Sequence, residues 1–185
     1  HHAADPRVRS SQSARYPRRV NSPAAAAPRQ AAPIRSYPSG AFDVGSVLAA
    51  KARTGSTISV CIPARNEATT VGDVVAAVRR DLVEGAALVD EVVVVDDHSS
   101  DATAEVAARA GARVIDAAGV LTSHGEGHGK GEALWKSLHE STGDLVVWVD
   151  ADITDFDPNF VVGMVGPLLT EPAVSFVKGH YRRPE

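Results

Sequence analysis

The fold is decided at residues 91–95, where the chain reads EVVVV and then turns at once to the polar run DDHSSD at 96–101. Consecutive valines without polar alternation are typical of a strand buried on both faces of a parallel sheet. We predict further strands at 57–62, 112–115 and 145–149, and a last short strand at 174–177.

Apolar residues recur at helical spacing between these strands. We predict helices over residues 71–82, 102–110, 132–141 and 157–169, the first with Thr69 or Thr70 as its N-cap. Strands that alternate with helices form βαβ units with right-handed crossovers. The predicted fold class is α/β, a Rossmann-like and mostly parallel sheet flanked by helices.

Residues 1–55 differ in composition from the rest of the chain. They hold six of the eleven prolines and are rich in Ala, Ser and Arg. Their nine Lys and Arg against two Asp and Glu give +7, whereas residues 56–185 carry ten against twenty-one and give −11, which sums to the −4 of the whole chain. Such a segment cannot offset its ordering entropy by apolar burial. We therefore predict a disordered tail over 1–55, helical at most near 47–52, and one domain over 56–185.

Composition excludes or disfavours several classes of protein. The tail is basic, but its arginines are scattered, so we predict a solubilising segment and no nucleic-acid partner. No apolar run approaches the roughly 20 residues of a transmembrane helix. The single cysteine, Cys61, excludes an intrachain disulfide and fits a reducing cytoplasm, and its place inside a predicted strand indicates a packed core thiol.

Polar clusters follow the first, second and fourth predicted strands. They are residues 63–67 (PARNE), 96–101 (DDHSSD) and 150–152 (DAD). Ligands of open parallel sheets bind beyond the carboxyl ends of the strands, at the switch point in strand order. If the order is 3-2-1-4, the three clusters converge on one cleft.

The acids Asp150 and Asp152 stand one residue apart at the end of the run LVVWV (145–149). Carboxylate oxygens are hard ligands for Mg²⁺ or Mn²⁺, and a metal held by one or two of them keeps positions for phosphate oxygens. We predict a divalent cation that carries a diphosphate. The alternative is that one Asp caps a turn and the other is solvated.

A glycine-rich loop, GEGHGKG at 125–131, precedes the predicted third helix. Backbone N–H groups of such a loop can approach an anion, and Lys130 would neutralise phosphate, although the spacing is not that of a P-loop. A flexible surface turn is the alternative. Asp97 and Glu67 could accept hydrogen bonds from a nucleotide, or they could serve as capping and first-turn acids.

The histidines and tryptophans are predicted to have structural roles. The histidines at 98, 124, 128 and 139 share no metal-ligand spacing. We predict that His124, His128 and His139 are solvated, and that Trp135 and Trp148 fill the core.

These motifs, in this order, resemble those of nucleotide-sugar glycosyltransferases of the GT-A fold. The broad features are PARNE, VDDHSSD (95–101) and VDAD (149–152), and the narrower ones are GKGEALW (129–135), GPLL (166–169) and VKGHYRRP (177–184). Together they resemble the glucosyl-3-phosphoglycerate synthases over about residues 56–185. Asp97 stands where that family often has Ser, and Arg65-Asn66 where it often has Leu-Asp.

The resemblance implies a substrate pair, a cofactor and roles for single residues. It implies UDP-glucose as donor, 3-phosphoglycerate as acceptor, and Mg²⁺ or Mn²⁺. The UDP-sugar would be bound by Pro63, Ala64, Arg65, Glu67, Asp97, Lys130 and Asp150. Asp150 and Asp152 would hold the metal, and Asp152 and Lys130 would be the catalytic groups.

Three functions stay open on the sequence. The first is a retaining glucosyl-3-phosphoglycerate synthase, and the second an inverting family-2-like transferase that acts on a lipid or polysaccharide. The third is a non-catalytic UDP-binding half-domain. Members of the resembled family continue beyond the position of Glu185 with a second half that supplies most acceptor contacts, a metal-ligating His and much of the dimer interface. We therefore expect an N-terminal portion, and a homodimer for the full-length protein.

Overall fold

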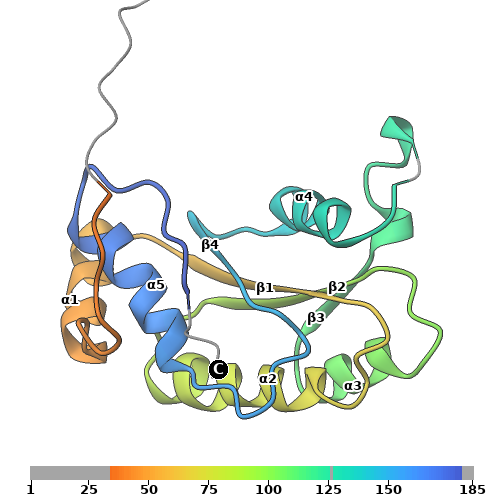
Figure 1. The fold of residues 1–185 in the computed structure, drawn as a ribbon, viewed down its shortest axis with the longest axis horizontal. Helices are drawn as coiled ribbons and strands as arrows, with labels where there is room; N and C mark the ends of the chain where they lie inside the picture. Colours follow the sequence, from red (N-terminus) through yellow and green to blue (C-terminus); the bar gives the residue numbers. More distant parts are fainter. Residues whose placement is uncertain (1–33, 126, 181–185) are drawn as a thin grey trace, which may run out of the picture. The chain divides into compact units, whose positions relative to one another are not determined.

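The computed structural model describes residues 34–125 and 127–180. Its centre is a parallel sheet, as predicted, with the strand order β3-β2-β1-β4, the order under which the three polar clusters were expected to converge (Figure 1). The strands are β1 (Ile58–Ala64), β2 (Glu91–Asp96), β3 (Arg113–Asp116) and β4 (Leu145–Trp148). In the central register Cys61 pairs with Val93 on one side and with Trp148 on the other. The carboxyl ends of β1, β2 and β4 therefore meet at one edge.

The helices cover both faces of this sheet (Figure 1). Helices α2 and α3 lie on one face, and α4 lies on the other. The elements are α1 (Val44–Thr54), α2 (Val71–Val78) with a π-helical continuation (Arg79–Gly85), α3 (Thr103–Arg109), α4 (Lys130–Glu140) and α5 (Asn159–Thr170). Two short 3₁₀ turns, Ala117–Gly119 and Thr122–His124, precede α4.

Two cores, one on each face, explain the unbroken apolar run in β2. Val92 and Val94 belong to the larger core, beneath α2, whereas Val93 and Val95 belong to the smaller core with Ala133 of α4. All four valines are buried. Burial of a valine side chain contributes roughly 1.5–3 kcal/mol, so a polar residue at any of these positions would be costly.

Helix α1 corrects the predicted tail boundary at residue 55. Asp43 caps the helix by accepting a hydrogen bond from Ser46 N at 3.0 Å, and Gly55 ends it with φ +67°. Val47 and Ala50 are completely buried in the larger core. The helix allowed near 47–52 is present, but it extends over 44–54 and belongs to the domain, so the boundary at 55 was wrong: its burial depends on packing against α5, far along the chain. The predicted tail over residues 1–33 lies outside the described part of the chain.

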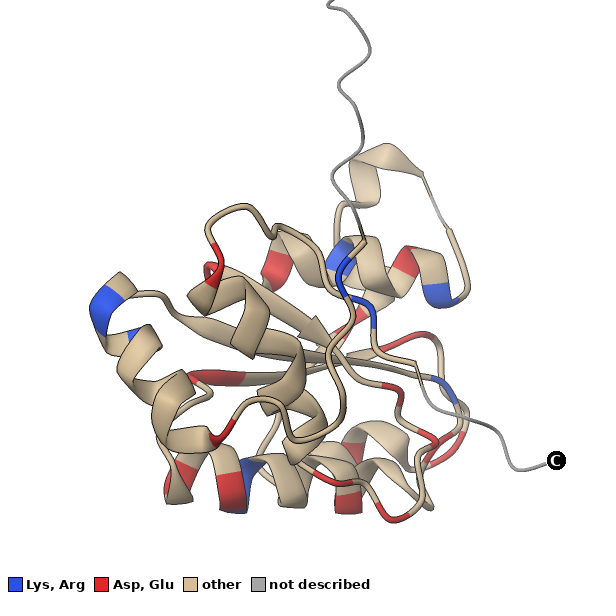
Figure 2. Cartoon of the chain, turned by 60° about the vertical axis from the view of Figure 1, so that its left-hand side comes forward, with Lys and Arg blue, Asp and Glu red and all other residues tan. Residues whose placement is uncertain are grey.

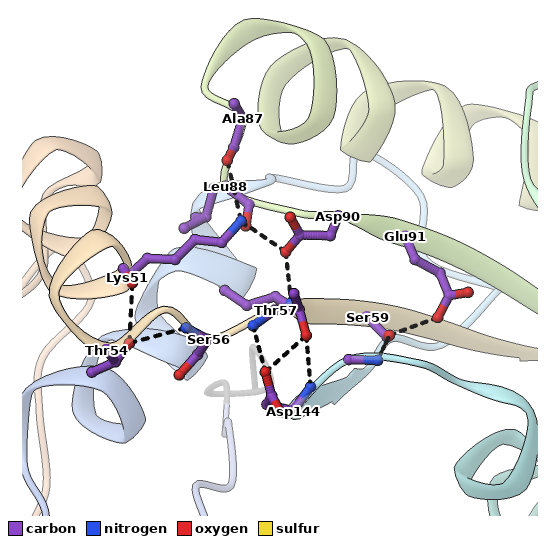
Figure 3. Close-up of polar contacts among 12 residues, drawn as sticks. Lys51, Thr54, Ser56, Thr57, Ser59, Ala87, Leu88, Asp90, Glu91 and Asp144 are labelled. Atoms are coloured by element: carbon purple, nitrogen blue, oxygen red, sulfur yellow. Dashed lines mark hydrogen bonds and ion pairs between the residues drawn. The ribbon is translucent and has the colours of Figure 1, made fainter.

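A polar network fixes the amino-terminal ends of the strands (Figure 3). Lys51 of α1 donates to Leu88 O at 2.8 Å and pairs with Asp90 at 2.7 Å. Asp90 also accepts from Ile58 N at 2.7 Å, and Asp144 accepts from Thr57 N at 2.8 Å. These contacts tie α1 to the starts of β1, β2 and β4, at the edge of the sheet opposite the polar clusters.

Glu91 forms a second polar centre beside this network (Figure 3). Its carboxylate accepts from Ser59 Oγ at 2.7 Å, from Thr142 N at 2.9 Å and from Arg113 at 2.8 Å. A Cβ on Gly143 would lie 2.6 Å from Ser59 N, so only glycine fits where the chain enters β4.

Two further expectations differ from the structure. The predicted strand at 174–177 is wrong: the structure has no strand there, and Phe176 is 72% exposed. Helix α4 begins at Lys130, two residues before the predicted start at 132, which places Lys130 in the first helical turn.

Within the described residues, no helix has the length and apolar character needed to cross a membrane.

Candidate functional site

A cleft of about 220 Å³ opens at the carboxyl edge of the sheet. Its walls come from the ends of β1, β2 and β4 and from the start of α4. It is lined by Pro63, Ala64, Arg65, Glu67, Asp97, Gly129, Lys130, Ala133, Asp150, Ala151 and Asp152. All eight predicted site residues therefore share one cleft, and Gly129, Ala133 and Ala151 are additions that sequence reasoning missed. The side chains of these three residues are no larger than a methyl group, so they take up little of the cleft volume.

The loops after β1 and β2 are fastened together by Asn66. Its backbone adopts φ +57°, a left-handed conformation that Asn tolerates better than most residues. The side chain accepts from Ser100 N at 2.8 Å, and the backbone N–H donates to Ser99 Oγ at 2.9 Å. Glu67 N donates to Thr103 Oγ1 at 2.8 Å. The polar residues after β2 thus position the PARNE segment.

Asp97 is the most deeply buried acid of the cleft, with its side chain only 4% exposed. Oδ2 accepts from Gly129 N at 2.8 Å, Oδ1 lies 3.0 Å from His98 Nδ1, and Arg65 approaches to 3.9 Å. Burial raises the pKa of Asp97, but the hydrogen bonds of His98 and Gly129 and the charge of Arg65 outweigh it and hold the pKa below its usual value. A carboxylate therefore fastens the glycine-rich loop to the end of β2.

Lys130 and Asp150 form an ion pair across the cleft. The pair joins the first turn of α4 to the residue that follows β4 by two positions. A cation at a helix N-terminus is unfavourable, and Asp150 offsets that charge. Lys130 therefore meets a carboxylate where the sequence interpretation placed a nucleotide phosphate.

Asp152 differs from Asp150 in having no partner among the residues that the structure describes. Its side chain is exposed, and it makes no hydrogen bond or ion pair with any described residue. Two exposed carboxylates one residue apart, one of them unpaired, fit a hard divalent cation such as Mg²⁺ or Mn²⁺. Asp150 and Asp152 are the residues that would hold it.

His124, His128 and His139 are exposed, as predicted, but two of them lie in ring contacts that the sequence did not indicate. His98 and His128 lie in edge contact, with ring centroids 4.5 Å apart, beside Asp97. His124 is in edge contact with Trp135, with centroids 5.9 Å apart. The spacing of these residues in the chain gave no signal, because the glycine-rich loop folds back onto the end of β2.

The two tryptophans divide between the surface and the core. Trp135 is 42% exposed, so its predicted core role is wrong. Trp148 packs against the smaller core, and its indole N–H donates to Ser137 Oγ at 2.9 Å. Cys61 is a free, buried thiol, as predicted, and burial raises its pKa to about 11. It is therefore not a nucleophile at neutral pH.

Sheet order, helix placement and the acidic strand-end cleft define a glycosyltransferase fold of the GT-A type. The profile described as "Glycosyl transferase family 2" matches residues 59–185, and the chain belongs to that family.

Relatives of known sequence and structure agree. The chain is 47% identical over 143 residues to glucosyl-3-phosphoglycerate synthase of Mycolicibacterium smegmatis, covering 77% of this chain and 46% of the relative. The crystal structure of the Mycobacterium tuberculosis enzyme of the same name superposes with a TM-score of 0.69 at 43% identity, covering 77% of this chain and 51% of that one. Mannosyl-3-phosphoglycerate synthase from Rubrobacter xylanophilus gives 0.71 at 42% identity, with 77% and 48% covered. The chain thus spans about half the length of the relatives it matches.

Proposed function

We propose that the chain is the donor-binding part of a metal-dependent, retaining glycosyltransferase that moves glucose from UDP-glucose to 3-phosphoglycerate. One observation carries the proposal: three strand ends and the start of α4 bring a cationic side chain and two metal-suited acids into one cleft. A structure of the M. tuberculosis relative contains Mn²⁺, UDP-glucose and phosphoglyceric acid, which supports this choice of ligands.

Donor binding would begin with an exchange of partners at Lys130. In the structure its ammonium group is neutralised by Asp150. A diphosphate that arrives with a divalent cation offers both groups a new partner: phosphate oxygens for Lys130, and the cation for Asp150 and Asp152. The ion pair would thus keep the charge of Lys130 neutralised until the metal and the diphosphate enter together.

The nucleoside would lie at the other end of the cleft. Pro63, Ala64, Arg65 and Glu67 would border the base and its ribose. The carboxylate of Asp97 would accept a hydrogen bond from the imide N–H of uracil. The low pKa of Asp97 favours this role, because an ionised carboxylate is an acceptor only.

In the transfer, the bond between the anomeric carbon and the diphosphate oxygen breaks, and a bond from that carbon to the acceptor oxygen forms. The metal, when bound, acts as a Lewis acid that stabilises the charge on the departing diphosphate. Lys130 would add a second positive charge at the same oxygens. For transfer with retention, the departing phosphate would take the proton of the acceptor hydroxyl.

Titration of UDP with and without Mn²⁺, followed by an assay of UDP release from UDP-glucose with and without 3-phosphoglycerate, tests the proposal. Acceptor-dependent UDP release supports it. Metal-dependent UDP binding without release favours a UDP-binding half-domain instead. Release that responds to a lipid or polysaccharide acceptor favours the inverting family-2-like alternative.

A mannose nucleotide belongs in the same assay, because one of the similar structures is a mannosyl-3-phosphoglycerate synthase. Asp152→Asn is the matched variant, since this side chain has no partner whose loss would disturb the fold. If Asp152→Asn binds UDP and Mn²⁺ as well as the parent chain, the metal assignment is wrong. For the full-length protein we further propose a homodimer and a cytoplasmic location, the latter consistent with the free thiol of Cys61.

A further inference from the structure

Asp97, His98 and His128 gather their potential ligand atoms at the rim of the cleft. One such atom from each residue lies within 4.8 Å of the other two. Across residues 34–125 and 127–180, no other trio of His, Cys, Asp or Glu meets so closely. The group comes from two places in the chain, the end of β2 and the glycine-rich loop before α4.

We propose that these three side chains form a second cation site, for Zn²⁺ or a similar nitrogen-seeking ion, separate from the Asp150 and Asp152 pair. Imidazole nitrogens suit Zn²⁺, Ni²⁺ and Cu²⁺, whereas carboxylates alone suit Mg²⁺ and Mn²⁺. The two acidic strand ends of one cleft would thus select different metals. Three protein ligands leave a fourth position for water.

The distances fit such an ion after a small adjustment. Zn–N and Zn–O bonds of about 2.0–2.1 Å in a tetrahedral site place the ligand atoms about 3.4 Å apart. Asp97 Oδ1 and His98 Nδ1 are already 3.0 Å apart. His128 would have to approach by at most about 1.4 Å, the difference between the 4.8 Å limit of the group and the spacing of about 3.4 Å. It is exposed and stands between Gly127 and Gly129, and Gly129 already adopts φ +96°, so the backbone there can adjust.

Asp97 is positioned in advance for a metal. Gly129 N–H holds Oδ2 at 2.8 Å and leaves Oδ1 directed toward the imidazole of His98. Backbone donors that fix a ligating carboxylate in this way raise metal affinity. Arg65, the nearest positive charge at 3.9 Å, is 57% exposed and can turn toward solvent.

Occupation of this site would compete with the nucleotide. The carboxylate that would hold Zn²⁺ is the one assigned above to the uracil base, so this consequence rests on the proposed function. The metal site itself does not, because its three ligands are defined without reference to a donor.

Calorimetric titration of the whole chain with Zn²⁺ tests the site, with Co²⁺ as an absorbing substitute. His98→Ala and His128→Ala should each lower Zn²⁺ affinity by at least about tenfold, since loss of an outer partner alone costs 10–100-fold. His139→Ala, an exposed histidine of α4, and Asp152→Asn are the controls and should bind Zn²⁺ as the parent chain does. Unchanged Zn²⁺ affinity in His128→Ala, or loss of Zn²⁺ binding in Asp152→Asn, would overturn the proposal.

A second titration separates the site from the proposed function. UDP affinity measured with Mn²⁺ should fall when Zn²⁺ is added to the parent chain, and it should not fall in His128→Ala. If Zn²⁺ binds through His98 and His128 and UDP affinity is unchanged, the metal site is confirmed and the placement of the base against Asp97 is wrong. Thermal unfolding of each variant checks that the fold is intact.

Discussion

Replacing Asp150 by Asn is expected to change UDP affinity in opposite directions without and with a metal. In the structure Asp150 neutralises Lys130, and the two side chains are 49% and 61% exposed. An ion pair with this exposure is worth about 0.2–1 kcal/mol. Loss of the pair leaves Lys130 free for phosphate.

The energy of the pair sets the size of the effect. Since 1.4 kcal/mol is a tenfold change in affinity, release of Lys130 should raise metal-free UDP affinity by up to about fivefold. With Mn²⁺ present, the same variant lacks one of the two carboxylates assigned to the metal, and UDP affinity should fall below that of the parent chain.

Calorimetry in EDTA and in Mn²⁺ measures both effects. Asp152→Asn is the matched control, because it removes the same charge two residues away without breaking an ion pair. Its metal-free gain should be smaller, since exposed charges are screened by salt. An equal gain in Asp152→Asn would refute the reasoning. So would a gain that persists when Lys130→Ala is added to Asp150→Asn.

Three further predictions concern stability. Glu91→Gln should lower the free energy of unfolding by about 1–3 kcal/mol at neutral pH, because a mostly buried carboxylate with three partners is lost. Burial raises the pKa of Glu91, but its hydrogen bonds outweigh this and hold the pKa below the usual value of 4.5, so the deficit should shrink as pH falls below 4.5 and the parent carboxylate is protonated. Urea unfolding across pH checks this, and a deficit independent of pH would contradict it. Gly166→Ala should lower the free energy of unfolding by about 1–3 kcal/mol, because the new Cβ would overlap the ring of Phe42, which packs on α5. Gly163→Ala on the same helix, with nothing within 4 Å, should be neutral or stabilising, and equal effects of the two changes in thermal unfolding would argue against the packing account. Asn66→Ala should weaken UDP binding and lower the free energy of unfolding by about 1–2 kcal/mol, because the left-handed backbone becomes strained and the hydrogen bonds between two cleft loops are lost. Asn66→Gly relieves the strain and should recover part of that stability in the same unfolding measurement. No recovery in Asn66→Gly would count against backbone strain.

The sheet could be predicted because its signals are local. The strands β1, β2 and β4 are mostly apolar runs, and the four valines of β2 indicate burial on both faces without reference to any other part of the chain. The order 3-2-1-4 was only the condition under which the three polar clusters would converge, and the structure has that order. Asp150 and Asp152 were found because a buried strand ends directly before them.

Helix α1 and the missing last strand show where local signals fail. Val47 and Ala50 of α1 are completely buried, but their burial depends on α5, far along the chain, and the surrounding Pro-, Ala- and Arg-rich composition obscures this helix. The run at 174–177 has strand-like residues, but the sheet supplies no partner for it among the described residues.

The sequence by itself determined a parallel α/β sheet and the positions of the acids at its carboxyl edge, because period, burial and strand ends are properties of short segments. Tertiary structure alone decided which side chains pair with one another inside the cleft. The pairing of Lys130 with Asp150, and the approach of His128 to His98, depend on how α4 and its glycine-rich loop close over the sheet. Contacts between loops separated in the chain are set by packing and by left-handed backbone turns, and residue spacing does not encode them.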